Sequence, residues 1–349
     1  MPQPPDHRLD LPDPTDQTGP TDQTGPADPF SPLAGLTLSR GVLDRRSELR
    51  ADPDLLPGLL ADPRTRVAVR RGDRMAVGQA DGRLRLQWRS PRPGDAETTA
   101  FFLGEAGGAA YLVVDDPTPA PEGEPAPGEP TWQTLRHAGL ALDDLDAGAF
   151  TTAQALANWH ATHRYCPRCG SETRPAAGGW MRRCPADGSE HFPRTDPAVI
   201  VSVIDADGRL LLGRGLGWPE GQYSVLAGFV EPGESFEAAV VREVAEESGV
   251  RIAEVRYLGS QPWPFPCSIM IGCTARATTT ELAPDSTEMA EVRWVSRPGY
   301  AALLRDGSIR VPGGISIARR LIERWLGTSV EEAAGRPVVE GWRPARPRD

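Results

Sequence analysis

The chain has 349 residues, with 38 Lys or Arg and 48 Asp or Glu, so its formal net charge at pH 7 is -10. This length is enough for two or three domains with separate cores, and a single domain is a poor fit. The acidic balance argues against a broad electrostatic surface for nucleic acid or an anionic membrane. We therefore expect a small substrate, and any nucleotide should be held locally with the help of a metal ion.

The sequence favours a cytoplasmic protein without a membrane partner. Its N-terminus is acidic and proline-rich, and no run approaches the ~18 apolar residues of a membrane span. Five cysteines, two of them in a Cys-x-x-Cys pair, fit a reduced compartment and a metal site better than a disulfide framework.

The first segment, residues 1–32, is rich in Pro, Asp, Thr and Gly and repeats one hexapeptide at 14–19 and 20–25. Such a composition cannot bury a core, so disorder is expected. Residues 33–162 are expected to form a β-rich N-terminal domain. Its apolar runs predict strands at residues 66–69, 84–88, 99–103 and 110–114.

Two helices are expected at the end of this domain. A Pro/Gly/Glu loop at 115–130 precedes them, and helical patterns follow at residues 135–136 and 150–162. The second pattern places Ala153, Leu156, Ala157 and His160 on one face.

Residues 163–195 have the cysteine spacing of a zinc ribbon. Cys166, Cys169 and Cys184 would supply three thiolates, but position 187, where a fourth cysteine is expected, holds Asp187. The aspartate offers an oxygen ligand, and nitrogen ligands are available from His160, His163 and His191. The alternative is a ribbon that folds without metal, with its cysteines as small buried hydrophobic residues.

The third domain, residues 196–327, begins with a β-hairpin pattern at 198–204 and 209–212. Further strands are expected at residues 223–230, 255–260, 269–275 and 292–295. A closing helix at 315–326 should turn inward the residues Ile317, Leu321, Ile322 and Trp325. These elements predict an α/β/α sandwich around a mixed sheet. The polar segment 328–349 is expected to be a frayed tail.

Residues 228–250, GFVEPGESFEAAVVREVAEESGV, are the chemical centre of the chain. Ser235 is a plausible N-cap, so a helix should begin after it and stop at Gly249. On this helix Glu243, Glu246 and Glu247 fall within an arc of about 100° at the edge of an apolar stripe.

Three crowded carboxylates repel one another, and a hard cation such as Mg2+ or Mn2+ would neutralise them through oxygen ligands. Arg242 is one residue away from the cluster and could pair with Glu234. The plain alternative is a solvated acidic helix face.

The longer pattern resembles the Nudix box at every specified position. Those positions are Gly228, Glu234, Arg242, Glu243, Val244, Glu246, Glu247, Gly249 and Val250. Nudix hydrolases cleave a nucleoside diphosphate linked to another moiety, so the resemblance implies an enzyme of this class.

A second motif, SQPWPFPCS, occupies residues 260–268. Its three prolines should make a stiff loop, and Trp263 and Phe265 offer flat apolar faces that could grip a ring. The alternative is a purely structural Pro-aromatic turn. The motif matches the SQPWPFPxS array of the NADH pyrophosphatase branch of Nudix enzymes, and this resemblance covers about residues 34–327.

Members of that branch hydrolyse NADH, and less well NAD, to AMP and nicotinamide mononucleotide, and some remove NAD caps from RNA. The resemblance implies divalent-metal ligation by Glu243, Glu247, Glu288 and the carbonyl of Ala227, with Glu246 beside this set. It implies a homodimer and substrate contacts from Gln261, Pro262, Trp263, Pro264, Phe265, Pro266, Cys267, Ser268, Phe192 and Ala318.

The chemistry expected from this set is attack of a metal-activated water on phosphorus, with Glu246 or Glu247 accepting its proton. Two positions depart from the branch: the missing fourth cysteine, and Gly179, which falls where the resemblance implies an acidic substrate-contacting residue. One alternative is a Nudix hydrolase for ADP-ribose or damaged nucleotides. Another, of a different class, is a non-catalytic nucleotide sensor or an RNA-binding module that uses the ribbon.

Overall fold

The structure is a computed structural model that describes residues 32–121, 123, 126, 129–338 and 340. The expected disorder of residues 1–32 therefore falls, except for Pro32, outside the described residues. Within the described part, no helix is both long enough and apolar enough to cross a membrane.

The N-terminal region is built on a mixed six-stranded sheet. Its strands are β1 (Arg66–Arg71), β2 (Arg74–Ala80), β3 (Arg83–Leu86), β4 (Thr99–Ala106), β5 (Ala109–Asp115) and β6 (Thr131–Thr134). Their order is β3-β2-β1-β5-β4, with β6 paired to β2, and β1 and β5 run parallel. The four expected strands are confirmed, whereas β2 and β6 were not predicted.

Helices and 3-10 turns flank this sheet: η1 (Ser47–Ala51), α1 (Leu55–Ala61), η2 (Pro93–Glu97), α2 (Leu135–Ala138) and α3 (Asp144–Thr162). Helix α3 begins at Asp144, earlier than the expected residue 150, because the side chain of Asp143 caps it by accepting a hydrogen bond from the Asp146 N–H. Its face with Ala153, Leu156 and Ala157 is buried in the core, as expected.

The cysteine segment forms a small sheet of β7 (Arg174–Ala176), β8 (Met181–Arg183) and β9 (Glu190–His191), with η3 (Ala177–Gly179) between the first two. Gly179 has a φ of +87°, and a Cβ there would lie 2.7 Å from Cδ1 of Phe101 and 2.8 Å from the Ala100 carbonyl oxygen. An acidic side chain does not fit at this position, which explains the glycine.

The C-terminal region contains a second mixed six-stranded sheet. Its strands are β10 (Asp196–Ile204), β11 (Leu210–Gly215), β12 (Leu226–Phe229), β13 (Ile252–Trp263), β14 (Ser268–Ala277) and β15 (Met289–Val295). Their order is β13-β14-β10-β11-β15, with β12 paired to β10, and β10 and β14 run parallel. The expected hairpin of β10 and β11 is confirmed, and β12 is shorter than the expected strand at 223–230.

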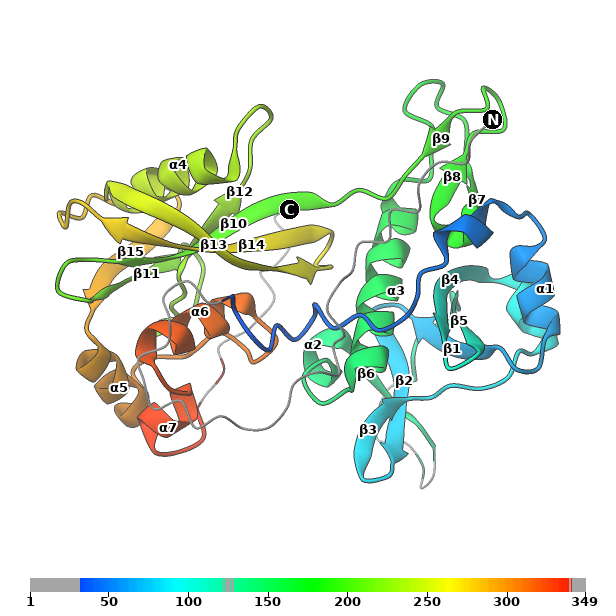
Figure 1. The fold of residues 1–349 in the computed structure, drawn as a ribbon, viewed down its shortest axis with the longest axis horizontal. Helices are drawn as coiled ribbons and strands as arrows, with labels where there is room; N and C mark the ends of the chain where they lie inside the picture. Colours follow the sequence, from blue (N-terminus) through cyan, green and yellow to red (C-terminus); the bar gives the residue numbers. More distant parts are fainter. Residues whose placement is uncertain (1–31, 122, 124–125, 127–128, 339, 341–349) are drawn as a thin grey trace, which may run out of the picture. The chain divides into compact units, whose positions relative to one another are not determined.

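Helices cover both faces of this second sheet: α4 (Phe236–Ser248), α5 (Arg297–Asp306), α6 (Ile317–Leu326) and α7 (Val330–Ala334). Figure 1 shows α4 on one side of the sheet and α6 on the other. Val240 and Val244 of α4 pack in one core cluster, whereas Leu321 and Trp325 of α6 pack in another. The expected α/β/α sandwich is therefore confirmed.

The prediction of a frayed tail after Gly327 was wrong for its first part. Ser329 and Glu332 form a capping box at the start of α7, and Val330 is fully buried against the core on the α6 side of the sheet. The polar composition concealed this helix because its stability depends on tertiary packing of two apolar residues.

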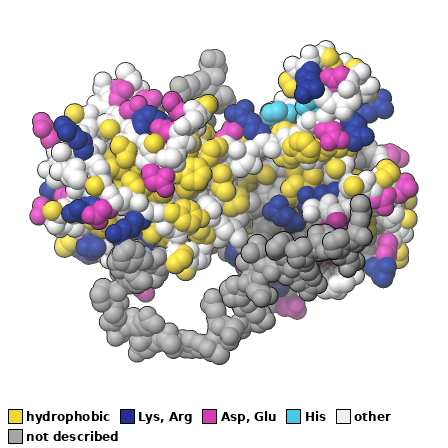
Figure 2. All heavy atoms as spheres, turned by 45° about the horizontal axis from the view of Figure 1, so that its top comes forward, with side chains coloured by type: hydrophobic (Ala, Val, Ile, Leu, Met, Phe, Trp, Pro, Cys, Tyr) yellow, Lys and Arg dark blue, Asp and Glu magenta, His cyan; other side chains and the backbone are white. Residues whose placement is uncertain are grey.

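On the face drawn in Figure 2, Arg side chains are interspersed with Asp and Glu around gathered hydrophobic side chains. This face therefore presents no broad surface of a single charge sign.

Candidate active site

Helix α4 holds the acidic cluster, and its ends are the expected ones. The hydroxyl of Ser235 accepts a hydrogen bond from the Ala238 N–H at 3.2 Å, and Gly249 ends the helix with a φ of 76°. Three glutamates separated by one turn or less are thereby fixed on one rigid element.

Arg242 organises the carboxylates. Its Nε and one terminal nitrogen donate to the two oxygens of Glu234, each at 2.9 Å, which is the predicted ion pair. Its other terminal nitrogen donates to Glu243 at 2.9 Å and to Glu246 at 3.0 Å. Hydrogen bonding between Arg242 and Glu234 lowers the pKa of the Glu234 carboxyl and raises the pKa of the Arg242 guanidinium. One cation therefore positions three carboxylates.

Gly228 makes room for Glu243. A Cβ at Gly228 would lie 1.9 Å from the carboxyl carbon of Glu243 and 2.1 Å from each of its oxygens. Burial raises the pKa of Glu243, although the hydrogen bond from Arg242 opposes that shift. The glycine is therefore required by close approach of a side chain, and the carboxyl group is pressed against the strand.

Glu247 is the least satisfied group in the cluster. Its Oε2 is buried and has no hydrogen-bond partner among the described residues. Burial, followed by the charge of Glu243, raises the pKa of Glu247 to about 8, and a hydrogen bond with the Ala227 backbone opposes the shift. A buried carboxylate oxygen without a partner fits a divalent cation, which would supply the missing charge and accept oxygen ligands.

Glu247 is the member of the acidic cluster on α4 that lines a cavity of about 1140 Å³, whereas Glu243 and Glu246 are not among its lining residues. Ala227, Glu247 and Glu288 lie in its wall together with Trp263 and Ala318. Acidic groups and an aromatic ring that are distant in the sequence therefore share one cavity, large enough for a dinucleotide rather than a single base.

Three family models match consecutive parts of the chain. A NADH pyrophosphatase-like rudimentary NUDIX domain matches residues 59–159, a NADH pyrophosphatase zinc ribbon domain matches 161–192, and a NUDIX domain matches 194–308. Proteins named NAD-capped RNA hydrolase NudC from Mycobacterium bovis and Mycobacterium tuberculosis are 40% identical over 305 residues, covering 82% of this chain and 94% of theirs.

The chain belongs to the NADH pyrophosphatase family of Nudix hydrolases. The human NAD-capped RNA hydrolase NUDT12 is 42% identical over 199 residues, covering 54% of this chain and 43% of that protein. A solved Nudix hydrolase from Nitrosomonas europaea matches 51% of this chain and 96% of its own at 21% identity, with a TM-score of 0.39.

In this NADH pyrophosphatase family member the aromatic array is a strand end and a tight turn rather than a loop. Gln261, Pro262 and Trp263 are the last residues of β13, and Ser268 begins β14 opposite Trp263. The expected stiff loop is confined to the turn at residues 264–267, because both strands extend into the motif. Asn158 holds the turn by donating to the carbonyl oxygens of Pro264 and Pro266 at 3.0 and 2.8 Å.

Only part of the expected substrate set lines the cavity. Trp263 and Ala318 do, whereas Gln261 is fully buried, accepts from the Leu38 N–H at 3.2 Å and donates to the Ile315 carbonyl at 2.9 Å. Phe265 packs edge-on against Trp263, with ring centroids 4.9 Å apart, and is covered by the Arg136 guanidinium. Residues outside the lining are Pro262, Pro264, Pro266, Cys267, Ser268 and Phe192.

The ribbon of this Nudix hydrolase brings together the four residues expected as zinc ligands. Ligand atoms of Cys166, Cys169, Cys184 and Asp187 all lie within 4.8 Å of one another. Hydrogen bonding with Ser189 lowers the pKa of Cys166 to about 6, which favours the thiolate.

The histidines considered as ribbon ligands lie outside this group. His160 instead hydrogen-bonds the Gly179 carbonyl at 2.8 Å, and His191 contacts Ser189 at 3.1 Å. Asp187 is therefore the residue that completes the set of four in the described part of the chain.

Sequence reasoning did not identify several cavity residues. Arg136 and His137 line the wall from the N-terminal region, as does Gln222 from the segment before β12. A hydrophobic pattern does not reveal these positions because their role depends on contacts between distant segments. The dipeptide Arg136-His137, which interrupts the apolar residues Leu135 and Ala138, was the available signal.

Proposed function

We propose that this Nudix hydrolase cleaves the pyrophosphate bond of NADH, and less well of NAD, to AMP and nicotinamide mononucleotide. The observation that carries the proposal is the buried, unpartnered Oε2 of Glu247, a residue that lines the acidic wall of a cavity also lined by Trp263. The unpartnered carboxylate oxygen suits a cation that would bind the pyrophosphate, and the Trp263 ring suits stacking of a flat base.

In this proposal Glu243, Glu247, Glu288 and the Ala227 carbonyl hold Mg2+ or Mn2+. A bound divalent ion of this kind lowers the pKa of a water molecule and neutralises charge on the phosphates. Arg242 keeps Glu243 and Glu246 in place through bonds of 2.9 and 3.0 Å. Oε2 of Glu247 is the proposed acceptor of the water proton, because it has no other partner, and Glu246 is the second candidate.

The substrate would be gripped at Trp263, with Ala318 leaving room beside it. The ring of Trp263 is fixed from behind by Phe265, and Arg136 lies over both rings at 5.0 and 3.6 Å from their centroids. The remaining residues of the array act in this proposal by positioning Trp263. Because the wall is already assembled, little ordering is needed when a base stacks on it.

The test is product analysis with NADH and with ADP-ribose, in Mg2+ or Mn2+, for the purified protein and its Glu247→Gln variant. The proposal expects AMP and reduced nicotinamide mononucleotide from NADH, faster than products from ADP-ribose, and no products with the variant. A preference for ADP-ribose would favour the alternative of a Nudix hydrolase for ADP-ribose or damaged nucleotides. Cleavage of neither substrate would favour a nucleotide sensor.

Removal of NAD caps from RNA is a second candidate function, because the relatives from both Mycobacterium species and from human carry that name. The mixed charges in Figure 2 indicate that RNA contacts would be few and local. Incubation with an NAD-capped oligonucleotide should leave a 5′-monophosphate RNA, and an intact cap after full NADH turnover would exclude this activity.

We further propose one structural Zn2+ on Cys166, Cys169, Cys184 and Asp187, supported by their mutual distances and the zinc ribbon match. Metal analysis should find one zinc per chain, and Asp187→Ala should lower that content. The family matches also support the proposed division into residues 33–162, 163–195 and 196–327.

A cytoplasmic homodimer completes the proposal. Phe192 is 65% exposed, so it is accessible to a second copy of the chain, as the dimer requires. Light scattering on the wild type and on Phe192→Ser would test this, since a monomeric wild type contradicts the dimer.

A further inference from the structure

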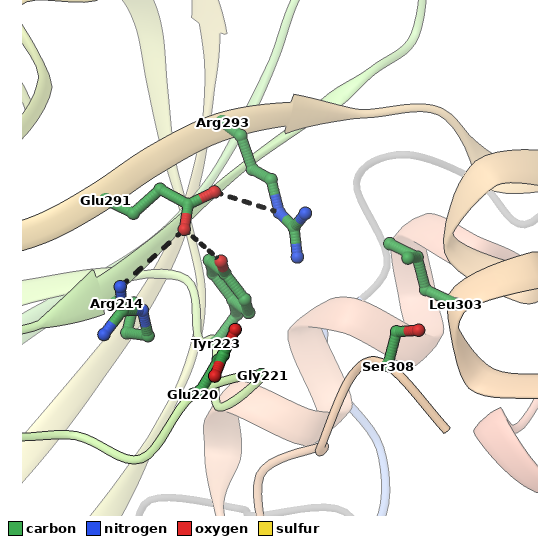
Figure 3. A pocket seen from close by; sticks show the side chains of 8 residues that line it. All are labelled: Arg214, Glu220, Gly221, Tyr223, Glu291, Arg293, Leu303 and Ser308. Atoms are coloured by element: carbon green, nitrogen blue, oxygen red, sulfur yellow. Dashed lines mark hydrogen bonds and ion pairs between the residues drawn. The ribbon is translucent and has the colours of Figure 1, made fainter. Parts of the chain in front are cut away.

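A second cavity of about 410 Å³ lies beside the first and belongs to none of the chemistry described so far. Figure 3 shows Arg214 of β11, Glu291 and Arg293 of β15, Tyr223 and Ser308 around it. Tyr223 also lines the large cavity, so one aromatic side chain separates the two spaces.

The arginines of this pocket are weakly engaged. One terminal nitrogen of Arg214 lies 3.8 Å from Oε2 of Glu291, and Nε of Arg293 lies 3.9 Å from Oε1, distances too long for hydrogen bonds. The hydroxyl of Tyr223 donates to Oε2 of Glu291 at 2.5 Å and is the carboxylate's closest partner. Nε of each arginine is buried and has no hydrogen-bond partner in the described residues.

The orientation of Arg293 leaves donors facing the cavity. Its guanidinium carbon lies 4.0 Å from the centre of the Tyr223 ring, a cation–π contact that fixes the plane of the group. In Figure 3 the terminal nitrogens point into the space bounded by Leu303 and Ser308. These nitrogens donate no hydrogen bond to any described residue, so a ligand would find them available.

The backbone around the pocket is shaped to bring Ser308 close. Gly221 has a φ of +79°, and a Cβ there would lie 2.6 Å from the Ser308 carbonyl oxygen. Glu220 also lines the pocket, but its side chain is exposed, so solvent screens its charge. The enclosed part of the pocket therefore offers two guanidiniums against one carboxylate that a tyrosine already engages.

We propose that this pocket binds a phosphate group of a nucleotide at the terminal nitrogens of Arg293, outside the cavity that holds the pyrophosphate. A planar guanidinium fork matches the oxygens of a phosphate. Arg214, which lies across the Glu291 carboxylate from Arg293, adds a second positive charge to the pocket. The phosphate belongs either to the RNA chain beyond an NAD cap or to a free mononucleotide. Only the first source rests on the proposed function.

The direct test titrates inorganic phosphate and AMP into metal-free protein by calorimetry, at low salt. Arg293→Gln should weaken phosphate binding about tenfold or more, because it removes charge-assisted hydrogen bonds. Arg214→Gln should weaken it less, because it removes only a nearby positive charge. Arg293→Lys should lose less, since it keeps the charge without the fork. Equal affinity in the wild type and Arg293→Gln would overturn the proposal.

The matched control is Arg276→Gln, which removes an exposed arginine of β14 that pairs with Glu254 at 2.6 Å and lines neither cavity. It should bind phosphate as the wild type does. A similar loss in this variant would show that only general charge is being measured, and would also overturn the site.

Kinetics distinguish the two sources. If RNA supplies the phosphate, Arg293→Gln should lower kcat/KM for a short NAD-capped RNA about tenfold and leave kcat/KM for NAD unchanged. If a mononucleotide supplies it, both rates should stay unchanged while inhibition by AMP weakens. No change in any of these quantities contradicts the pocket. A wild type that cleaves neither substrate contradicts the proposed function, whereas the phosphate titration still decides the pocket.

Discussion

The two six-stranded sheets of this chain share one plan. In each, a hairpin (β4–β5 or β13–β14) ends in a strand that runs parallel to the first strand, β1 or β10. That first strand pairs antiparallel with the next, β2 or β11, which in turn pairs with a later strand, β6 or β15. The match of residues 59–159 to a rudimentary NUDIX domain agrees with this correspondence.

The regions differ in the segment before the hairpin. The N-terminal region has only the 3-10 turn η2 there, and its buried acid Asp95 receives two hydrogen bonds from Arg89, at 2.6 and 2.7 Å, and one from the Arg92 N–H. The C-terminal region has the helix α4, whose Glu247 retains an unpartnered oxygen.

The pKa values of Asp95 and Glu247 are shifted in opposite directions. Burial alone would raise the pKa of Asp95, but the bonds from Arg89 and Arg92 lower it, whereas the pKa of Glu247 rises to about 8. The same sheet plan therefore supports a satisfied carboxylate in one region and a carboxylate that needs a cation in the other. The capacity for chemistry lies in that unsatisfied group, and the sheet itself provides only its position.

The largest expected effect is on turnover. Glu247→Gln should lower kcat with NADH about a thousandfold or more, because it removes a metal ligand and the proposed proton acceptor. The unfolding free energy of the metal-free variant should not fall, since the neutral amide replaces an acid that burial already keeps protonated. Steady-state kinetics and urea unfolding measure the two quantities.

Glu237→Gln is the matched control, because Glu237 lies on the same helix and is exposed. Its kcat should equal that of the wild type. Retained activity in Glu247→Gln would show that turnover does not depend on the unpartnered carboxylate that distinguishes the C-terminal region from the N-terminal one.

The reverse pattern is expected for Asp95→Asn. It should lower the unfolding free energy by about 3 kcal/mol, because Arg89 would be left without its charged partner, and should leave kcat per folded molecule unchanged. Asp73→Asn, at an exposed turn with a contact of 4.0 Å to Arg74, should change stability by less than about 0.5 kcal/mol. Equal losses of unfolding free energy in the two variants would show that the Asp95–Arg89 ion pair does not stabilise the fold.

A smaller effect, on the order of 2 kcal/mol, is expected from His160. Burial, with help from the charge of Arg182, lowers its pKa from 6.5 to about 4. Between these pH values the unfolded chain binds more protons than the folded one, so stability is complete above pH 6.5 and falls as the pH drops towards 4.

Urea unfolding at several pH values measures this dependence, and other acids also contribute to it. The relevant quantity is therefore the difference between the wild type and His160→Gln. If both lose stability equally between pH 6.5 and 4, the buried histidine is not the cause.

The smallest effect concerns the contact between the two regions. Trp263 packs against the N-terminal core and also lines the large cavity. Trp263→Ala should raise KM for NADH about tenfold with a smaller change in kcat, because the ring binds substrate without entering the chemistry. Phe265→Leu, behind the ring, should alter KM less. An unchanged KM for NADH in Trp263→Ala would contradict the proposed binding of the substrate by the Trp263 ring.

Local signals explain what the sequence predicted well. Ser235 and Gly249 marked both ends of α4, and Arg242 and Glu234 were close enough in the pattern to suggest their ion pair. Strands with apolar runs, such as β4 and β5, were also recognised. These features depend on neighbouring residues, so the chain order contains most of the information.

The features that were not predicted from the sequence depend on contacts between residues far apart in the chain. Strand β6 is short and only partly buried, and it is ordered by pairing with β2. Gln261 belonged to a substrate motif, yet its amide is used to tie Leu38 to Ile315. The missing partner of Glu247 also had no sequence signal, since only the assembled surroundings determine which oxygen is left over.

The close approach of Glu243 to Gly228 also bears on how such a site can change over generations. The Glu243 carboxyl group on the helix fills the space that a side chain at Gly228 on the strand would occupy. The residue at one of these positions therefore limits which residue fits at the other. Any larger residue at 228 requires a shorter one at 243, and the pair should vary together or not at all. A lineage that lost Glu243 could acquire a larger residue at position 228. That larger residue would then prevent a glutamate from returning at position 243, and with it the catalytic activity.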